Sequence, residues 1–429
     1  MKKILIRTLI TVLSLASLYG VGRLIDVSYG SFQFVERQPY TLLQTPSSIT
    51  LKWQTPESER GSIAYGLTPD TLTNVLFEEQ KSKKHRITIP KLQECTKYYY
   101  SVTSSSLEID NDERSFTTLC SSKEFQRLWV IGDSGEKGKN QKEVYARFMA
   151  YINYNYDALD SWVLLGDNAY SSGTQKQYNK QMFKPYQELI KHITPWAVIG
   201  NHDARRWAFY DIFEFPQNAE SGGVASHAQE FYSIDDGNLH LVMLDSETIN
   251  RDADGAMATW LKKDLAANTK PWTIVVFHTP PYSDGGHKSD ERWNSGGRLT
   301  DMRENFVPIF DKYGVDLVLN GHSHGYERSK LLVNHTGTSD TLSPKNILQD
   351  KKTNYTKSVI NKENSGTVYV VCGSSAKLDS ARYKHPAMPY SLEEMGSLIL
   401  EITPTTLTSK FLNIDGKIAD EFTITKEEQ

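Results

Sequence analysis

The sequence predicts two domains, an N-terminal all-β sandwich and a larger C-terminal α/β domain built from βαβ units. Three observations support this prediction. The chain has 429 residues, which exceeds a single domain at roughly 100–200 residues each. Short runs of alternating apolar residues fill residues 38–119, a pattern typical of β-strands. From residue 126 onwards, strand-like runs alternate with longer amphipathic segments, which indicates crossover helices between strands.

The composition excludes several classes of protein. With 48 Lys+Arg against 52 Asp+Glu, the net charge is -4, which gives no electrostatic footprint for nucleic acid or an anionic membrane. Three cysteines are too few for a disulfide scaffold or a cysteine-only zinc site. The apolar fraction of 38% and the charged fraction of 23% are ordinary for a soluble globular protein.

Residues 1–22 form a segment distinct from both domains. Lys2, Lys3 and Arg7 precede an apolar run at 9–18, and small residues follow around Ala16. This is the pattern of a secretory signal peptide, with cleavage expected after Ala16. An uncleaved membrane anchor stays open, because the stretch is near the lower limit for a spanning helix. Either form exports the protein, to the periplasm, the cell surface or the medium, and only the uncleaved form makes the membrane a partner.

The all-β domain is expected over 36–120, as a sandwich of fibronectin type III or immunoglobulin style. Cys95 and Cys120 flank two neighbouring predicted strands. In an antiparallel hairpin these positions lie close together, so a disulfide and two free thiols both stay open. Cys372, in the apolar run TVYVVCGSS, is expected to be a buried small hydrophobe.

The α/β domain is expected over 126–425, with a largely parallel sheet. Helices are predicted within 142–154 and 178–192, around Ala256 to Ala267 and around Leu299 to Tyr313. The polar stretch at 335–364 shows no pattern and is predicted to be a loop or an insertion. The tail after residue 396 returns to strand-like alternation.

Polar side chains follow five of the predicted strands. Asp133, Asp167 and Asn201 each come directly after a glycine, and both spacings between them are 34 residues, enough for one crossover helix per unit. Two later strands end at His278 and at the His-Ser-His of His322 and His324. Since ligands bind at the carboxyl ends of parallel strands, we expect these side chains to meet.

Two carboxylates, an amide oxygen and three imidazoles in one place indicate a metal site. Carboxylates brought together without a cation repel each other, and one pKa then rises. Mixed oxygen and nitrogen donors suit zinc, manganese or iron better than calcium. Six groups exceed the needs of one tetrahedral ion but suit two metals sharing a carboxylate, the arrangement that clamps both oxygens in phosphoryl transfer. The residues therefore predict a dinuclear hydrolase.

These motifs resemble those of the purple acid phosphatases, a branch of the calcineurin-like metallophosphoesterases. The matching motifs are GDSG (132–135), GDNAY (166–170), GNHD (200–203), VVFH (275–278) and GHSH (321–324). The resemblance covers about 40–425 and implies a fibronectin III-like domain followed by a metallophosphoesterase sandwich of mixed sheets flanked by helices. In the wider superfamily a histidine occupies the position of Gly135. The purple branch has a tyrosine in its place, at the position of Tyr170 in this sequence.

The resemblance also implies a set of metal ligands. One ion would be held by Asp133, Asp167, Tyr170 and His324. The other would be held by Asp167, Asn201, His278 and His322, with Asp167 bridging. Because a tyrosine binds metal as its phenolate, and its free pKa is near 10, a hard trivalent ion is expected beside it. The implied cofactor is a dinuclear centre of Fe(III) with Zn(II), Mn(II) or Fe(II).

The function implied is hydrolysis of a small phosphomonoester by in-line attack of a metal-bound hydroxide. His202 and His287 match histidines that the family places over the substrate phosphate, as hydrogen-bond donors and candidate general acids. Asp203 is expected to orient them. In plant members a second histidine follows His287, whereas this chain has Lys288.

Two other functions stay open. A phosphodiesterase or nucleotide hydrolase would use the same metal core, and loops 205–230 and 283–298 do not distinguish it. A non-catalytic surface binding protein is disfavoured, because an inert relic has no physical reason to keep the full ligand set. The sequence sets neither the oligomeric state nor the physiological ester.

Overall fold

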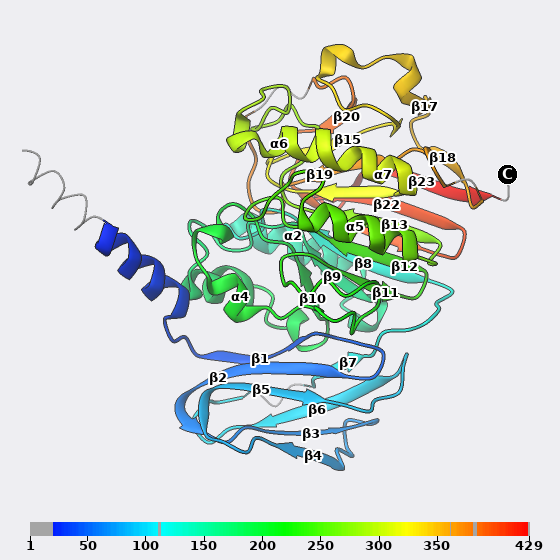
Figure 1. The fold of residues 1–429 in the computed structure, drawn as a ribbon. Helices are drawn as coiled ribbons and strands as arrows, with labels where there is room; N and C mark the ends of the chain where they lie inside the picture. Colours follow the sequence, from blue (N-terminus) through cyan, green and yellow to red (C-terminus); the bar gives the residue numbers. More distant parts are fainter. Residues whose placement is uncertain (1–19, 110–112, 361, 381–383, 428–429) are drawn as a thin grey trace, which may run out of the picture.

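The computed structural model describes residues 20–109, 113–360, 362–380 and 384–427 (Figure 1). Most of the predicted leader lies outside this part of the chain, and residues 20–32 are helical. Among the described residues, no helix is both long enough and apolar enough to cross a membrane.

The N-terminal domain is the expected β-sandwich (Figure 1). Its two sheets have the strand orders β1-β2-β5 and β4-β3-β6-β7. The strands are β1 (Arg37–Leu42), β2 (Ile49–Glu59), β3 (Ser62–Gly66), β4 (Asn74–Phe77), β5 (Ser82–Ile89), β6 (Lys97–Thr103) and β7 (Ser115–Thr117). Alternate residues of both sheets share one core around Trp53. Cys95 and Cys120 form a disulfide, which settles the pairing that the sequence left open.

The α/β domain contains two seven-stranded mixed sheets. The first has the order β10-β9-β8-β21-β22-β23-β18. Its strands are β8 (Gln126–Ile131), β9 (Ser161–Leu164), β10 (Pro195–Ala197), β18 (Asn354–Ser358), β21 (Gly396–Ile402), β22 (Thr406–Asn413) and β23 (Ile418–Glu427). Strands β8, β9 and β10 pair in parallel, as the βαβ pattern predicts.

The second sheet has the order β11-β12-β13-β14-β19-β15-β20. Its strands are β11 (Tyr232–Asp236), β12 (Leu239–Met243), β13 (Trp272–Val276), β14 (Leu317–Asn320), β15 (Tyr326–Arg328), β19 (Val368–Cys372) and β20 (Tyr390–Leu392). Strands β12, β13, β14 and β19 are parallel. A small hairpin of β16 (Leu331–Leu332) and β17 (Ile347–Gln349) lies beside it. Cys372 is buried at the end of β19, as expected.

The two sheets pack against each other, and helices cover their outer faces. Along β13, Ile274 and Val276 join the core shared with the first sheet, whereas Val275 faces a second core built with the helices. Helices α5 (Ala256–Ala267) and α7 (Val307–Tyr313) supply that second core. Helix α2 (Lys139–Tyr151) covers the first sheet, where the rings of Phe148 and Trp129 stack at 4.5 Å. Short helix α4 (Ala208–Ile212) lies nearer the N-terminal domain (Figure 1).

Three expected elements differ from the structure. The helix predicted within 178–192 is broken into α3 (Gln175–Tyr178), a π-helical turn (Asn179–Phe183) and a 3-10 turn (Leu189–Lys191), because Pro185 cannot donate a helical hydrogen bond. The helix expected near 299–313 is present without a break over 298–313, but a π-helical turn (Met302–Phe306) lies between α6 (Arg298–Asp301) and α7.

The third difference lies in the stretch 335–364, which was expected to be a loop. It contributes β17 and β18, and β18 pairs in parallel with β23 at the edge of the first sheet. The prediction was wrong because edge strands are short and polar, so their hydrophobic pattern is weak.

Candidate metal centre

The predicted site residues come from the strand ends of two different sheets. Asp133, Asp167 and Asn201 follow β8, β9 and β10 of the first sheet, whereas His278 and the His-Ser-His of 322–324 follow β13 and β14 of the second. The strands expected to share the edge of one largely parallel sheet therefore belong to two mixed sheets, as the family resemblance implied. Each sheet contributes its own parallel strand ends, and the two sets meet where the packed sheets share an edge.

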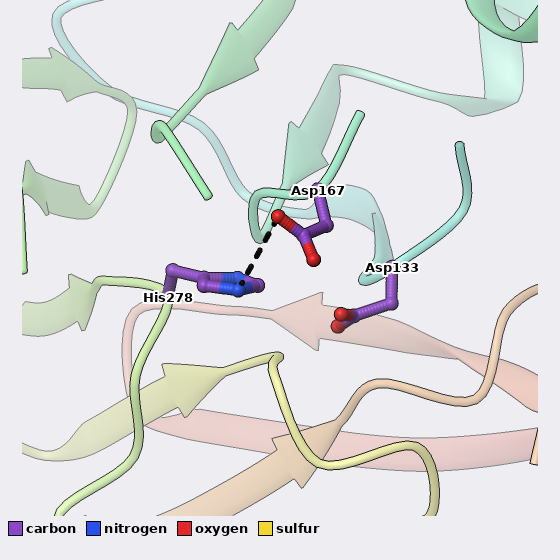
Figure 2. A group of neighbouring side chains, drawn as sticks. All are labelled: Asp133, Asp167 and His278. Carbon is purple, nitrogen blue, oxygen red and sulfur yellow. Dashed lines mark ion pairs between the residues drawn. The ribbon is translucent and has the colours of Figure 1, made fainter. Parts of the chain in front are cut away.

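Asp133, Asp167 and His278 form the centre of the cluster (Figure 2). One ligand atom from each lies within 4.8 Å of the others, and all three side chains are buried. Figure 2 shows the carboxylate of Asp167 between the other two groups, with His278 Nε2 3.6 Å from Asp167 Oδ1. Both aspartates have a left-handed backbone, with φ of 52°, a conformation that is uncommon for non-glycine residues but tolerated by aspartate.

Glycines before the aspartates and the asparagine allow this close approach. A Cβ on Gly200 would lie 2.1 Å from the backbone nitrogen of Asp167. Gly166 has φ of +92°, and a Cβ there would lie 2.6 Å from His278 Nδ1. Only glycine fits these two positions without moving the ligand loops.

Asn201 and His322 extend the cluster beside His278. The oxygen Oδ1 of Asn201 lies 3.2 Å from His278 Nε2 and 2.9 Å from His322 Nδ1. His278 Nδ1 lies 2.8 Å from the carbonyl oxygen of Leu165. Because a carbonyl oxygen only accepts, Nδ1 of His278 carries a proton, and in the neutral ring the lone pair of Nε2 points into the cluster.

His324 and Tyr170 extend the cluster beside Asp133. His324 Nε2 lies 3.3 Å from both Asp133 Oδ1 and the hydroxyl oxygen of Tyr170. Tyr170 donates to Asp133 Oδ1 at 3.0 Å. On the other side of the ring, His324 Nδ1 lies 2.7 Å from Asp379 Oδ1, and the backbone N–H of His324 donates to Asp379 Oδ2. A carboxylate on Nδ1 orients the ring so that Nε2 faces Asp133 and Tyr170, as second contacts of this kind do for metal-binding histidines.

The chemistry of this donor set fits cations. Burial and the charge of Asp133 raise the pKa of Asp167, so the paired carboxylates need compensating positive charge. Burial and both carboxylates raise the pKa of Tyr170 well above its ordinary value, so the phenol ionises only beside a cation. Burial and the neighbouring His278 lower the pKa of His322 well below its ordinary value, which keeps this ring neutral. Against the effect of burial, the carboxylates of Asp167 and Asp133 raise the pKa of His278 to about 9, so a proton on this ring stands where a cation would balance the carboxylates.

His202 lies at the rim of the cluster. Its backbone N–H donates to Asp167 Oδ1 at 2.8 Å, and its Nδ1 donates to the carbonyl oxygen of Ser171 at 2.7 Å. Its Nε2 lies 3.8 Å from Asp167 Oδ2, and 23% of the side chain is exposed. The ring packs at 4.4 Å from that of Tyr170. His202 therefore turns one ring nitrogen toward the protein and the other toward the site.

His287 covers the opposite part of the cluster. Its ring stacks on that of His322 with centroids 3.8 Å apart. Its Nδ1 lies 3.1 Å from Ser295 Oγ and 3.2 Å from Asn294 Oδ1. Ser295 Oγ also lies 2.6 Å from His322 Nε2. The loop 283–298 thus places His287 within the cluster, beside a metal-ligand candidate.

Asp203 does not contact the imidazole of His202 through any of its hydrogen bonds. Its carboxylate accepts from the backbone N–H groups of Asn168, Ala169 and Gly200, and from the hydroxyl of Tyr178 at 2.6 Å. It therefore braces the loops that carry Asp167 and Asn201. Burial and the charge of Asp167 raise its pKa to about 7.

Three contacts of the site had no sequence signal. Asp379 lies in an irregular loop far along the chain from His324, Ser295 is one serine of a polar loop, and Ser171 acts through its backbone. The ammonium group of Lys377 also lies 4.5 Å from the centre of the Tyr170 ring, an attraction of cation–π type. None of these residues follows a strand or belongs to a spaced motif.

The fold and the strand-end cluster are those of a calcineurin-like phosphoesterase, whose family model matches residues 126–326. Residues 36–118 match the model of the purple acid phosphatase N-terminal domain. Together the two matches cover well over half of the chain, in the same order as the observed domains. The chain belongs to the purple acid phosphatase family.

Curated relatives agree with this assignment. Purple acid phosphatase 22 of Arabidopsis thaliana is 30% identical over 272 residues, which are 60% of this chain and 56% of that protein. Purple acid phosphatase 21 of the same plant is 28% identical over 330 residues, 72% of this chain and 70% of that protein. Human acid phosphatase type 7 is 27% identical over 66% of this chain and 68% of that protein. The chain thus spans little more than half the length of the first of these relatives.

Solved structures share the fold. The purple acid phosphatase PPD1 from yellow lupin (Lupinus luteus) seeds aligns with a TM-score of 0.70 and 17% identity, over 92% of this chain and 76% of that one. The structure of PhoD aligns with a TM-score of 0.62 and 12% identity, over 92% of both chains. These likenesses extend over both domains and confirm the predicted fold class.

Proposed function

We propose that this protein is a metal-dependent acid phosphatase that hydrolyses small phosphomonoesters at the strand-end cluster. The observation that carries the proposal is the close grouping of Asp133, Asp167 and His278, at the positions where the family motifs stand. Buried carboxylates and imidazoles grouped in this way are the donor set of a metal-assisted hydrolase.

The residues around the cluster separate into two ligand sets. Asp133, Tyr170 and His324 lie on one side of Asp167, and Asn201, His278 and His322 lie on the other. Asp167 would be shared by both ions. Because the Tyr170 phenol needs a hard cation to ionise, we assign Fe(III) to its side and Zn(II), Mn(II) or Fe(II) to the other. When bound, the two ions would supply an acidified water and neutralise the charge that develops on the phosphate.

His202 is the residue best placed to donate a proton to the leaving oxygen. The carbonyl oxygen of Ser171 holds the proton on Nδ1, so in the imidazolium form Nε2 carries the second proton on the side of the site. After Nε2 gives up that proton, the ring remains a neutral tautomer with the same hydrogen bond to Ser171. His287, stacked over His322, is assigned to hydrogen-bond the phosphate.

The Cys95–Cys120 disulfide supports an exported protein. Disulfides persist in oxidising compartments and are rare in the cytosol, and this one closes the N-terminal domain. It agrees with the basic and apolar leader of the sequence. We therefore assign the chain to the periplasm, the cell surface or the medium.

Comparison of ester substrates tests the proposed reaction. We expect kcat/KM on an aryl phosphate monoester to exceed that on the matching diester by at least about tenfold, because a second ester group replaces one of the non-ester oxygens that the two ions and His287 are assigned to bind. A reversed ratio, with metal content unchanged, would assign the site to a phosphodiesterase. No turnover of either ester by the metal-loaded protein would favour a binding protein.

Tyrosine substitution tests the assigned metals. Iron-loaded protein should show a visible band from tyrosinate bound to Fe(III), and Tyr170→Phe should remove it. Tyr178→Phe is the matched control, since Tyr178 is also buried and donates to a site carboxylate, Asp203, but lies in neither ligand set. A band that persists in Tyr170→Phe would contradict the assignment of Fe(III) beside Tyr170.

A further inference from the structure

An exposed apolar stripe runs along the helix of residues 20–32. Its members recur every three or four residues, so they share one face of the helix. They are Val21, Leu24, Ile25, Tyr29 and Phe32, each more than half exposed, with Leu24 at 71%. In Figure 1 this helix, drawn in blue, extends away from the body of the protein. No described part of the chain covers the stripe.

The base of the helix is fixed to the protein body. The backbone oxygen of Ser31 accepts from Gln175 Nε2 at 3.0 Å, and its hydroxyl accepts from the backbone N–H of Trp207 at 2.8 Å. Asp26 forms an ion pair with Arg206. A Cβ on Gly30 would lie 3.0 Å from the side chain of Arg206, so the helix packs tightly there. The direction in which the stripe faces is therefore set by the fold.

The charged residues of the helix lie away from the stripe. By the helical period of 100° per residue, Arg23 and Asp26 fall on the other side from Leu24 and Ile25, and Ser28 is the one polar side chain within the stripe. An apolar face of this kind on a short projecting helix is unfavourable in water. A helix with one apolar and one polar face is typical of segments that lie in the interface of a bilayer.

In the uncleaved chain, the preceding sequence favours a membrane as the partner. The apolar run at 9–18, with Lys2, Lys3 and Arg7 before it, is followed directly by the helix that carries the stripe. The stripe begins beyond Ala16, so a chain cleaved after Ala16 keeps it. Trp207, 62% exposed, is bonded to the base of the helix and adds a residue type that favours the membrane interface.

We propose that this stripe, together with Trp207, docks the protein on the surface of a lipid bilayer. The inference does not depend on the proposed phosphatase activity. The loops that hold the helix, around Gln175 and Arg206, are continuous with the loops that carry Tyr170 and His202. Docking would therefore fix the orientation of the candidate site relative to the membrane.

Site-directed fluorescence tests the proposal on the full chain. Leu24→Cys and Arg23→Cys are each labelled with an environment-sensitive fluorophore, since the native thiols are either buried, at Cys372, or in the disulfide. Vesicles of phosphatidylcholine and phosphatidylglycerol are then added. We expect the label at residue 24 to shift to the blue and gain at least about threefold in emission. The label at residue 23 should change little, because it faces away from the bilayer.

Several results would overturn the proposal. Equal responses at both positions would mean that the helix is surrounded by lipid as a spanning segment, and no response at either would mean that it stays in water. Iodide, which quenches fluorophores exposed to water, tests what covers the stripe before vesicles are added. If the label at residue 24 is already protected from iodide, residues 1–19 cover the stripe. If that protection depends on protein concentration, a second copy of the chain covers it. As a further check, Leu24→Ser with Ile25→Ser should reduce vesicle flotation of chain cleaved after Ala16 by at least about tenfold.

Discussion

Two buried clusters of histidine and aspartate in the α/β domain differ in the acceptors that their histidine nitrogens contact. In the first, His240 lies between two carboxylates, with Nδ1 2.7 Å from Asp235 Oδ1 and Nε2 2.9 Å from Asp264 Oδ2. Both ring nitrogens thus have an anionic acceptor. In the second, the strand-end cluster, His278 donates one proton to the carbonyl oxygen of Leu165, and its other nitrogen faces the acceptor oxygens of Asn201 and Asp167.

The comparison shows that residue types alone do not define a metal site. Around His240, Asp264 also accepts from the hydroxyl of Ser233 and the backbone N–H of Val224. Hydrogen-bond donors of the protein therefore satisfy the carboxylate oxygens of this cluster. In the strand-end cluster Nε2 of His278 lies 3.6 Å from Asp167 Oδ1, too far for a hydrogen bond, and a cation between them would complete both groups. The first cluster stabilises the fold, and the second is available for chemistry.

The largest expected effect separates these two roles directly. Asp167→Asn removes the shared carboxylate and should reduce hydrolysis of an aryl phosphate by more than about a thousandfold. The matched control is Asp264→Asn, since both aspartates are buried and lie beside a histidine. The control should lower the melting temperature but keep turnover per folded molecule. Equal losses of turnover in both variants would show that the two clusters do not differ in their role in the reaction.

The next effect is on the pH dependence of stability. Burial alone would lower the pKa of His240, but Asp235 and Asp264 together raise it to about 9. Because this value exceeds the unfolded value near 6.5, the contribution to stability is complete below about pH 6.5 and is lost as pH rises through about 9. At about 1.4 kcal/mol per pKa unit, it amounts to about 3 kcal/mol. Thermal unfolding of His240→Gln against the parent should show this difference at pH 6 and little of it at pH 9.5.

His335→Gln provides the control for that experiment. Burial lowers the pKa of His335, so the advantage of the parent over this variant should grow as pH rises rather than shrink. If His240→Gln showed the same trend as His335→Gln, the ion pairs of His240 would not hold its proton.

A smaller effect is expected from the residue behind His324. Asp379→Asn weakens the carboxylate contact with Nδ1 of His324, and such substitutions behind a ligand typically cost about tenfold or more in metal affinity. Chelator titration of the loaded protein measures this loss. Asp340→Asn, at an exposed position, should leave the affinity unchanged. Unchanged affinity in Asp379→Asn would mean that packing alone orients His324.

Much of the fold followed from sequence patterns because the relevant signals are local. Helix α5 begins and ends at the predicted residues 256 and 267, since its apolar period is clear along its whole length. The parallel strands that precede Asp133, Asp167 and Asn201 are buried on both faces and have continuous apolar runs. Edge strand β18 is partly exposed and lacks such a run, which is why it was predicted to be a loop.

The site was predictable where its residues end strands and not elsewhere. Asp133, Asp167 and His278 follow apolar runs, so sequence order alone indicates their common edge. That they come from two sheets depends on strand pairing over long separations, for which the sequence carries no local signal. Asp379 and Ser295 reach the cluster through loops, whose path depends on the packing of the whole domain.

Metal analysis of the purified full chain tests the central claim most directly. After incubation with iron and zinc and removal of free ions, the account predicts two metal ions per parent chain and, in Asp167→Asn, the loss of most of both, because this carboxylate is shared. Asp264→Asn should keep the parent content. A parent chain that holds no more than one ion, or an Asp167→Asn variant that holds as much metal as the parent, would contradict a two-metal site at the strand ends.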